Sequence, residues 1–306
     1  MESKLKSIAA VVVGYNPDIE VLDDLLMSLS AQVSLLILVD NGGAENYLSK
    51  HPDVKSSVRY LPMEGNKGLG VALNAGFELA VTAGFPYMVT FDQDSHAASD
   101  LIASLESAMM LAKSRDEKCI AVSPTFFDRR DGGKKIAFPF YRSVDGVIKP
   151  IFTSDDPHGL VRADALITSG MFVDTRAWKE GIKYDEGMFV DFTDTEWCFR
   201  VSDHGYSLYG CLNVEMGHAL SDAPPVKIFG LSFFRYSPVR RYFFFRNTVA
   251  VCRMPHTPDC WKKRLSIALM LRFAVNLLID SNRLQSFKMM VRGIRHGLRN
   301  SLGSAH

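Results

Sequence analysis

Cysteine is scarce in this chain of 306 residues, and the five that occur are scattered and odd in number. None forms a Cys-x-x-Cys pair, which argues against a disulfide framework or a zinc knuckle and favours a reducing compartment. Long hydrophobic runs are also missing, since no stretch reaches the roughly 18 uncharged apolar residues that a membrane-spanning helix needs. The opening MESKLKSIAAVVVGY has only a short apolar run, so we expect a first strand there rather than a secretion signal.

Acidic residues are nearly absent from the last quarter of the chain. From Ile228 onward, 14 lysines and arginines stand against 2 acidic residues, a balance of +12, whereas the preceding residues carry 21 against 32. A mildly acidic body is therefore joined to a strongly basic C-terminal region. The boundary is placed after residue 222, where the composition becomes aromatic and basic.

Short apolar runs alternate with helical periodicity through the first part of the chain. The runs SIAAVVVGY, VSLLILVDNG, SVRYLPM and YMVTFDQDS end at glycine or polar residues, as buried parallel strands do. Between the first two runs, apolar residues recur at helical spacing from Ile19 to Leu29. This alternation predicts an open α/β sheet, a fold that binds ligands at the carboxyl ends of its strands.

Polar residues gather at four of the predicted strand ends, in GYNP (14–17), DNGG (40–43), GNKGLG (65–70) and DQDS (92–95). In an open α/β sheet these four sites should converge on one crevice. The glycines of GNKGLG would let the backbone approach a ligand and present amides to an anion. The spacing matches neither the dinucleotide fingerprint nor a Walker loop, which disfavours dehydrogenases and kinases. Taken singly, each motif could also be an ordinary turn or helix cap.

Asp92 and Asp94 are one residue apart at the end of a strand, so their side chains could share one face. Two neighbouring carboxylates repel each other unless a cation lies between them. A divalent cation that also bridges to a diphosphate would remove this repulsion and stabilise a departing phosphate. His218 follows another strand-like run and could complete the metal site, although a lone histidine is more often structural.

A second acidic segment, YDEGMFVDFTDTEWCFR (184–200), holds five acids interspersed with aromatic residues. A carboxylate beside apolar rings can have a raised pKa and act as a general base. The alternative interpretation is that Asp194 stabilises the first turn of a helix.

Together these motifs resemble a known family. VVVGYNP, VDNGG, GNKGLGVALNAG, TFDQDS, SGMFVD, DEGMFVDFTDTEWCFR and GH follow one another as in the bacterial rhamnosyltransferases of the family-two inverting, nucleotide-sugar-dependent glycosyltransferases. The resemblance covers roughly Ala9 to Asp222 and extends weakly into RRYFFFRN. FDQDS with FVDFTDTEWCFR resembles the rhamnosyl branch in particular, whose donor is dTDP-L-rhamnose.

The resemblance implies a GT-A fold, a Rossmann-like open mixed sheet flanked by helices. Residues 1–222 would form the catalytic domain, with a nucleotide-binding half (1–98) and an acceptor half (99–222). Residues 223–306 would form a basic, helical, membrane-associating extension. The implied nucleotide-sugar contacts are Tyr15, Asn16, Asp40, Asn66, Lys67, Gly68 and Asp92.

The resemblance also implies a metal site and a base. Asp94 would be the direct metal ligand and His218 would complete the coordination, while Asp92 would contact the nucleotide or a metal-bound water. Carboxylate and imidazole ligands suit Mn²⁺ at least as well as Mg²⁺. Asp194 would be the catalytic base, with Asp191 the less favoured candidate. The residues expected to shape the acceptor site are Asp191, Glu196 and Trp197.

The C-terminal region contains an apolar run from Leu265 to Ile279 that Arg272 interrupts. It is too short and too charged to span a bilayer. Further on, Phe287, Met290, Val291, Ile294 and Leu298 fall on one helical face, with basic residues on the other. These helices could pack on the catalytic domain or lie on anionic lipid. No base-reading motif supports a nucleic-acid partner.

We therefore expect a metal-dependent transferase that moves L-rhamnose to a hydroxyl of a polyprenyl-diphosphate-linked glycan, in the assembly of O-antigen or a related surface polysaccharide. It would work peripherally on the cytoplasmic face of the inner membrane. A UDP-hexose or UDP-N-acetylhexosamine donor is the main alternative, and an inactive membrane-associated binding protein is a weaker one. A nucleotidyltransferase is disfavoured because GYNPDIE lacks the glycine- and arginine-rich loop such enzymes carry after the first strand.

Overall fold

The computed structural model describes residues 7–44, 47, 51, 57–128, 136–217, 226–228, 231–233, 237–280 and 282–304. Its first part alternates strands and helices: β1 (Ile8–Gly14), α1 (Ile19–Ser30), β2 (Leu35–Asp40), β3 (Val58–Pro62), α4 (Leu69–Thr82), β4 (Tyr87–Asp92) and α5 (Leu101–Arg115). The four strands run parallel, as their apolar, β-branched sequences predicted.

Further strands extend this sheet. They are β5 (Cys119–Asp128), β6 (Ile136–Ala137), β9 (Leu160–Ala163), β10 (Met171–Asp174) and β11 (Ser207–Gly217). In the described residues the sheet has the order β3-β2-β1-β4-β10-β5-β11-β9, with β6 paired to β5. It is mixed because β10 runs antiparallel to β4 and β5, and β9 runs antiparallel to β11. This arrangement places β1 and β4 side by side within the sheet, with Val13 opposite Asp92.

Smaller elements surround the sheet. The hairpins are β7 (Phe140–Val144) with β8 (Val147–Ile151), and β12 (Val226–Ile228) with β13 (Leu231–Phe233). The helical elements are α6 (Arg176–Lys179), η2 (Glu186–Met188) and α7 (Thr193–Asp203). The segment between η2 and α7 lies beside the start of α4, since the Leu69 amide donates to the Phe189 carbonyl at 2.5 Å.

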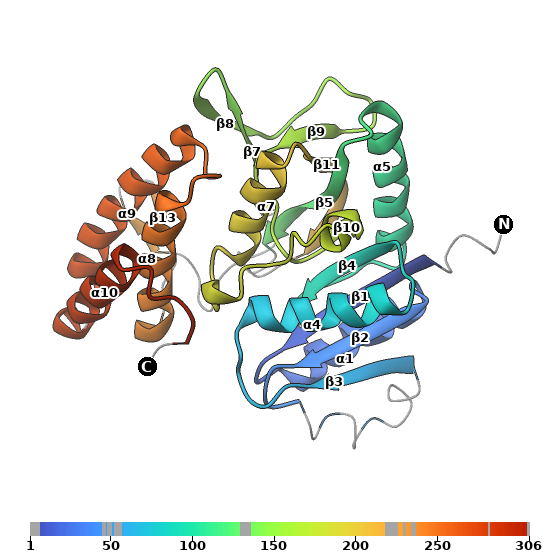
Figure 1. Cartoon of the computed structure of the whole chain (residues 1–306), viewed down its shortest axis with the longest axis horizontal. Coiled ribbons are helices and arrows are strands. Elements are labelled where there is room, and N and C mark those ends of the chain that lie inside the picture. The colour runs from blue at the N-terminus through green and yellow to red at the C-terminus, as the bar shows by residue number, and fades with distance from the viewer. Residues whose placement is uncertain are drawn as a thin grey trace.

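The sheet is buried on both faces because successive strand residues point to opposite sides. On one face Val12 and Phe91 pack with residues of α1 and α5, such as Leu26 and Met109. On the other face Val11 packs with residues of α4, α6 and α7, such as Phe77, Trp178 and Trp197. Figure 1 shows these helices on either side of the twisted sheet.

Three helices complete the described chain: α8 (Pro238–Arg253), α9 (Asp259–Ile279) and α10 (Arg283–Leu298). They lie together beside the α/β body, at the side where α7 is found (Figure 1). A small apolar cluster joins them to the body, with Met188 and Phe199 packed against Val251 and Trp261. None of the helices in the described ranges has both the length and the apolar character needed to cross a bilayer.

The face predicted for α10 is divided between two environments. Met290 is fully buried, and Phe287 and Leu298 are exposed. The helix approaches α8 through Gly293 and Gly297, where an added Cβ would lie only 2.6 Å from the Tyr242 carbonyl oxygen and 2.5 Å from the Arg246 carbonyl oxygen. Part of the amphipathic pattern therefore reflects packing between helices, because glycine permits this close approach.

Candidate active site

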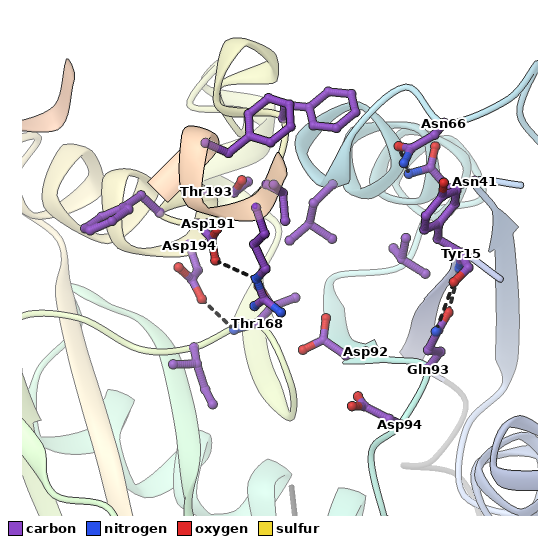
Figure 2. A pocket seen from close by; sticks show the side chains of 18 of the residues that line it. Tyr15, Asn41, Asn66, Asp92, Gln93, Asp94, Thr168, Asp191, Thr193 and Asp194 are labelled. Carbon is purple, nitrogen blue, oxygen red and sulfur yellow. Dashed lines mark hydrogen bonds and ion pairs between the residues drawn. The ribbon is translucent and has the colours of Figure 1, made fainter. Parts of the chain in front are cut away.

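A pocket of about 750 Å³ opens at the carboxyl ends of β1 and β4, a volume typical of ligand sites. Its lining comes from the ends of β1, β2 and β4, the turn before α4, residues 167–168, the segment 189–194 and the start of α8. In Figure 2 Tyr15, Asn41 and Asn66 lie on one side, Asp191 and Asp194 on the other, and Asp92 and Asp94 between them. All four predicted strand-end motifs thus contribute side chains to one crevice, and GYNP does so through Tyr15.

The wall opposite the acidic segment is built by side chains that bond to turns. Asn41 Nδ2 donates to Asn66 Oδ1 at 3.1 Å, and Asn41 Oδ1 accepts the Lys67 main-chain amide hydrogen at 2.8 Å. Gln93 accepts from the Tyr15 amide and donates to the Tyr15 carbonyl, which fixes the backbone there. The Tyr15 ring remains 48% exposed, so it offers a flat apolar surface to a ligand.

Asp92 and Asp94 both line the pocket, at and just after the end of β4. Ser169 Oγ donates to Asp92 Oδ2 at 2.6 Å, which orients that carboxylate. Carboxylate oxygens are the ligands that Mg²⁺ and Mn²⁺ prefer, so the donor chemistry fits a divalent ion. Among the described residues no group of three or more His, Cys, Asp or Glu side chains is arranged to hold a metal.

His218, the predicted third ligand, lies outside the described residues. The chain just before it is described: β11 ends at Gly217, and the Gly217 carbonyl accepts the His96 amide hydrogen at 3.2 Å. The end of β11 is therefore beside a segment only two residues from Asp94.

Asp194 lies in the first turn of α7 and lines the pocket. One oxygen accepts the Thr168 amide hydrogen at 3.1 Å and the other accepts the Thr195 amide hydrogen at 2.6 Å. Burial raises the pKa of Asp194 to about 6, and the negative charge of Asp92 adds to this, while the amide hydrogen bonds act in the opposite direction. A carboxylate with this pKa can accept a proton near neutral pH.

Asp191 also lines the pocket, but its surroundings differ from those of Asp194. Its Oδ1 lies 3.3 Å from Nε of Arg240, and its side chain is only 11% exposed. A paired guanidinium favours the charged carboxylate and weakens it as a proton acceptor. This geometry favours Asp194 over Asp191 as the base.

The expectation that Glu196 and Trp197 shape the acceptor site stays a prediction, and the structure places both residues outside the pocket lining. Both side chains are buried, with 1% and 2% exposed, and neither lines the pocket. Glu196 bonds Arg200 Nε at 2.7 Å and lies 2.9 Å from His256 Nε2, and Trp197 Nε1 donates to the Ile182 carbonyl at 3.0 Å. In α7 the first-turn Asp194 lines the pocket, whereas Glu196 and Trp197 are buried in the core. Glu196, two positions after Asp194, points to the opposite side of the helix.

Asp40 and Gly68 have structural roles instead of lining the pocket. The Asp40 carboxylate, 3% exposed, accepts from the Gly42 and Ala44 amides at 2.8 and 3.1 Å and from the Tyr60 hydroxyl at 2.6 Å. At Gly68, where φ is +94°, an added Cβ would lie 2.8 Å from the Phe189 backbone. This glycine therefore permits the close approach of another chain segment, which is a different reason from the predicted approach of a ligand.

Asn16 and Lys67 are exposed and are not among the residues that line the pocket. Their main chains support it: the Asn16 amide donates to the Gly42 carbonyl at 2.8 Å, and the Lys67 amide bonds Asn41 as described above. Contact of either side chain with a nucleotide sugar stays a prediction.

Several pocket residues were missed by sequence reasoning. Asn41 and Gln93 belong to motifs that were identified, DNGG and DQDS, so the signal was present but unassigned. Arg240 and Phe243 come from α8 and lie about fifty positions beyond the acidic segment. The composition of that region is basic and aromatic, but nothing in it places particular side chains in the pocket.

Comparison with known proteins identifies related sequences. Residues 10–136 match the family described as Glycosyl transferase family 2. A relative from Shigella flexneri, described as "dTDP-rhamnosyl transferase RfbF", is 26% identical over 297 residues, which is 97% of each chain. The family match covers β1 to β6 and therefore includes DNGG, GNKGLG and DQDS but not the segment 184–200.

Solved structures share the fold. A structure of GalNAc-T7 described as containing UDP, GalNAc and Mn²⁺ aligns with a TM-score of 0.54 at 14% identity, over 90% of this chain and 58% of that one. Residues 1–349 of S. aureus TarS align with a TM-score of 0.53 at 13% identity, over 96% and 82% of the two chains. The expected GT-A fold is confirmed.

Proposed function

We propose that this protein, a glycosyltransferase with a family 2 domain, transfers L-rhamnose from dTDP-L-rhamnose to a hydroxyl of a glycan acceptor. The observation that carries the reaction type is the single pocket that Asp92, Asp94 and Asp194 share, with a base candidate whose pKa is raised to about 6. The choice of donor is supported by the relative of nearly equal length, whose description names dTDP-rhamnose transfer.

The nucleotide would occupy the wall formed by Tyr15, Asn41 and Asn66. The exposed Tyr15 ring can pack against a flat base, and the asparagine amides can bond the base or ribose. The diphosphate then lies toward Asp92 and Asp94, which would hold Mn²⁺ or Mg²⁺ together with His218. That ion would neutralise charge on the departing dTDP.

Asp194 would accept the proton of the acceptor hydroxyl as its oxygen attacks the anomeric carbon. The new bond joins that oxygen to the anomeric carbon, and the bond to the donor phosphate oxygen breaks with its electron pair leaving on dTDP. A single displacement of this kind inverts the configuration at the anomeric carbon. The Thr168 and Thr195 amides hold the carboxylate in place for the transfer. Arg240, on the pocket wall beside Asp191, supplies positive charge for the diphosphate.

The acceptor is proposed to be a polyprenyl-diphosphate-linked glycan, presented at the cytoplasmic face of the inner membrane during O-antigen or related polysaccharide assembly. Exposed apolar side chains on α9 and α10 support peripheral attachment: Ile267, Met270, Leu271, Leu278, Leu284, Phe287 and Leu298. Exposed basic residues such as Lys263, Arg283 and Arg295 accompany them. Apolar side chains with basic neighbours suit the surface of an anionic bilayer.

A donor panel tests the proposed function. Purified protein is titrated with dTDP-L-rhamnose, dTDP-glucose, UDP-glucose and UDP-N-acetylglucosamine in the presence of Mn²⁺, Mg²⁺ or EDTA. Turnover is measured as donor hydrolysis, in which the sugar is transferred to water and the nucleoside diphosphate is released. We expect preference for dTDP-L-rhamnose and loss of turnover in EDTA. Preference for a UDP-sugar would contradict the rhamnosyl assignment, and the absence of turnover with every donor would favour a binding protein over an enzyme.

A further inference from the structure

The segment from Gly187 to Phe192 has an unusual backbone. Phe189, Asp191 and Phe192 have φ values of +64°, +51° and +67°, which L-residues with large side chains rarely adopt. Such residues persist where the surrounding structure determines their conformation, and they often occur at functional sites. This segment lines the pocket through Phe189, Val190, Asp191 and Phe192, and it leads directly into the turn that carries Asp194.

Hydrogen bonds from outside the segment satisfy five consecutive carbonyls, those of Gly187 to Asp191. Asn247 Nδ2 donates to the carbonyls of Met188, Val190 and Asp191, and Arg246 donates to those of Gly187 and Met188 at 3.0 and 2.9 Å. The remaining carbonyl, of Phe189, accepts the Leu69 amide hydrogen at the start of α4. Two neighbouring side chains of α8 thus provide most of the donors that hold this backbone.

Arg246 and Asn247 are both fully buried, at 0% exposure. Arg246 Nε donates to Asn247 Oδ1 at 2.9 Å, which orients the amide so that Nδ2 faces the segment. The guanidinium also donates to the Gly303 carbonyl and lies 4.8 Å from the Phe243 ring centroid. Placing a guanidinium in the interior is costly, and here the compensation comes from main-chain carbonyls and an aromatic ring.

The position of α8 is fixed in turn by the helices and the chain that follow it. Gly293 and Gly297 bring α10 against the backbone of α8 at Tyr242 and Arg246. Beyond α10, the Gly303 amide donates to the Gly187 carbonyl at 2.8 Å. The C-terminal region is therefore connected directly to the first residue of the strained segment.

We infer that Arg246 and Asn247 are positioning residues for catalysis. They hold the backbone from Gly187 to Asp191 so that Asp191 pairs with Arg240 and α7 begins with Asp194 in the pocket. The C-terminal helices thereby form part of the catalytic unit, whatever their contact with lipid. The inference rests on the proposed function for the identity of the base, but the mechanical connection does not depend on the donor sugar.

The test compares two buried arginines on the same helix. Arg246→Gln and Asn247→Ala remove donors to the segment, whereas Arg241→Gln is the matched control because Arg241 bonds Ser286 and Asp280 and stabilises the packing of α8 on α10. For each variant kcat, the Kd for dTDP and amide hydrogen exchange of the peptide covering 186–193 are measured at a temperature where it is folded. Activity is measured with the donor that the panel identifies.

We expect kcat to fall by at least about 100-fold in Arg246→Gln and Asn247→Ala, because small displacements of reacting groups have effects of this size. The dTDP Kd should change by a much smaller factor than kcat, since these bonds do not hold Tyr15, Asn41 or Asn66, and only the contact of Arg240 with the diphosphate would be weakened. Exchange in the 186–193 peptide should accelerate in both variants but not in Arg241→Gln. Arg246→Lys should recover part of the lost kcat, as it keeps the charge and some of the hydrogen bonds.

Unchanged exchange in the 186–193 peptide would overturn the inference, as would equal losses of kcat in the Arg241 and Arg246 variants. A wild-type preference for another donor would contradict the rhamnosyl proposal alone. The exchange measurement needs no donor, so failure of the proposed function and failure of this inference remain distinguishable.

Discussion

Asp191 and Asp194 are three positions apart in the chain and face the same pocket, yet their surroundings give them different chemistry. Asp191 is paired with a guanidinium, whereas the Asp194 carboxylate is buried near a second carboxylate and bonded by amides. At the residue scale, these surroundings decide which carboxylate can take a proton, because a paired cation lowers proton affinity and burial raises it.

The raised pKa of Asp194 predicts the pH dependence of the reaction. A base works in its deprotonated form, so kcat/KM should be constant above about pH 6 and fall by about tenfold per pH unit below it. Asp194→Asn should lower kcat by about 10²–10⁴-fold and leave the dTDP Kd nearly unchanged. Rate profiles from pH 4.5 to 8.5, compared with those of Asp191→Asn, check this. Complete loss of activity in Asp191→Asn with substantial turnover in Asp194→Asn would move the base to Asp191.

Glu196 is predicted to support stability rather than the reaction. Its burial by itself raises the pKa, but hydrogen bonds from His256 and Arg200 outweigh burial and leave the pKa below the ordinary value of 4.5. The interaction of Glu196 with His256 and Arg200 therefore stabilises the fold above about pH 4.5. This stabilisation is lost as the pH falls through the lowered pKa of the folded state. Glu196→Gln should reduce the free energy of unfolding by about 2 kcal/mol at pH 7.

Denaturant unfolding of Glu196→Gln at pH 7, with the exposed Glu117→Gln as control, measures this loss. The kcat of the folded variant should stay within about threefold of the wild type, because Glu196 does not line the pocket. A large fall in kcat without loss of stability would return Glu196 to the acceptor site.

At the scale of secondary-structure elements, the start of α4 and the segment 185–192 are packed in direct contact. An added Cβ at Gly68 or Gly70 would lie 2.8 Å from the backbone of Phe189 or Asp185. The glycine-rich turn and the acidic segment, about 120 residues apart, therefore depend on each other for their conformation. A shift of either element displaces the pocket wall that carries Asp191.

Gly68→Ala and Gly65→Ala form a matched pair that isolates this contact. Both glycines have positive φ, +94° and +80°, so both substitutions carry a backbone cost of about 1–2 kcal/mol. Only Gly68→Ala also introduces the clash with Phe189, since nothing lies within 4 Å of a Cβ at Gly65. Gly68→Ala should therefore lose more stability in thermal unfolding, by at least about 1 kcal/mol. Equal losses would show that the contact is relaxed without cost.

At the scale of the whole molecule, the C-terminal helices have two faces with different surroundings. On one face, Arg246 and Asn247 donate hydrogen bonds to the segment that lines the pocket. On the other face, apolar side chains of α9 are exposed, among them Ile267 and Met270 with 63% and 66% exposed. Attachment through the second face would bring a pocket that already depends on α8 close to a lipid-linked acceptor.

The proposed attachment of α9 to lipid can be tested with a double substitution, Ile267→Glu with Met270→Glu. Removing two apolar side chains and adding negative charge should weaken binding to vesicles that contain anionic phospholipid by at least about tenfold. Wild-type binding should decline at high salt and on zwitterionic vesicles. Co-sedimentation measures the binding, with Met27→Glu on α1 as control, because Met27 is also an exposed apolar residue, at 59%, and lies on a helix of the α/β body. Equal effects of the two changes would argue against a specific surface on α9.

The alternation of apolar runs and helical repeats was sufficient to predict the α/β sheet, the parallel order of its first strands and the gathering of motifs at their ends. These features depend on local periodicity and on the common direction of parallel strands, so they can be inferred from neighbouring residues in the chain. Asp92, Asp94 and Asp194 could be found in this way because each lies at the end of a strand or the start of a helix.

The features that could not be predicted from the sequence depend on packing between residues far apart in the chain. Sequence alone could not separate Asp194 from Glu196, because which side of α7 faces the pocket depends on where the helix lies against the sheet. It could not explain Gly68, whose neighbour Phe189 is brought to it by the fold. It also could not show that Arg246 and Asn247 hold the backbone of a segment some sixty positions earlier. Those contacts come from α8, a helix far along the chain, and they join the C-terminal region to the active site.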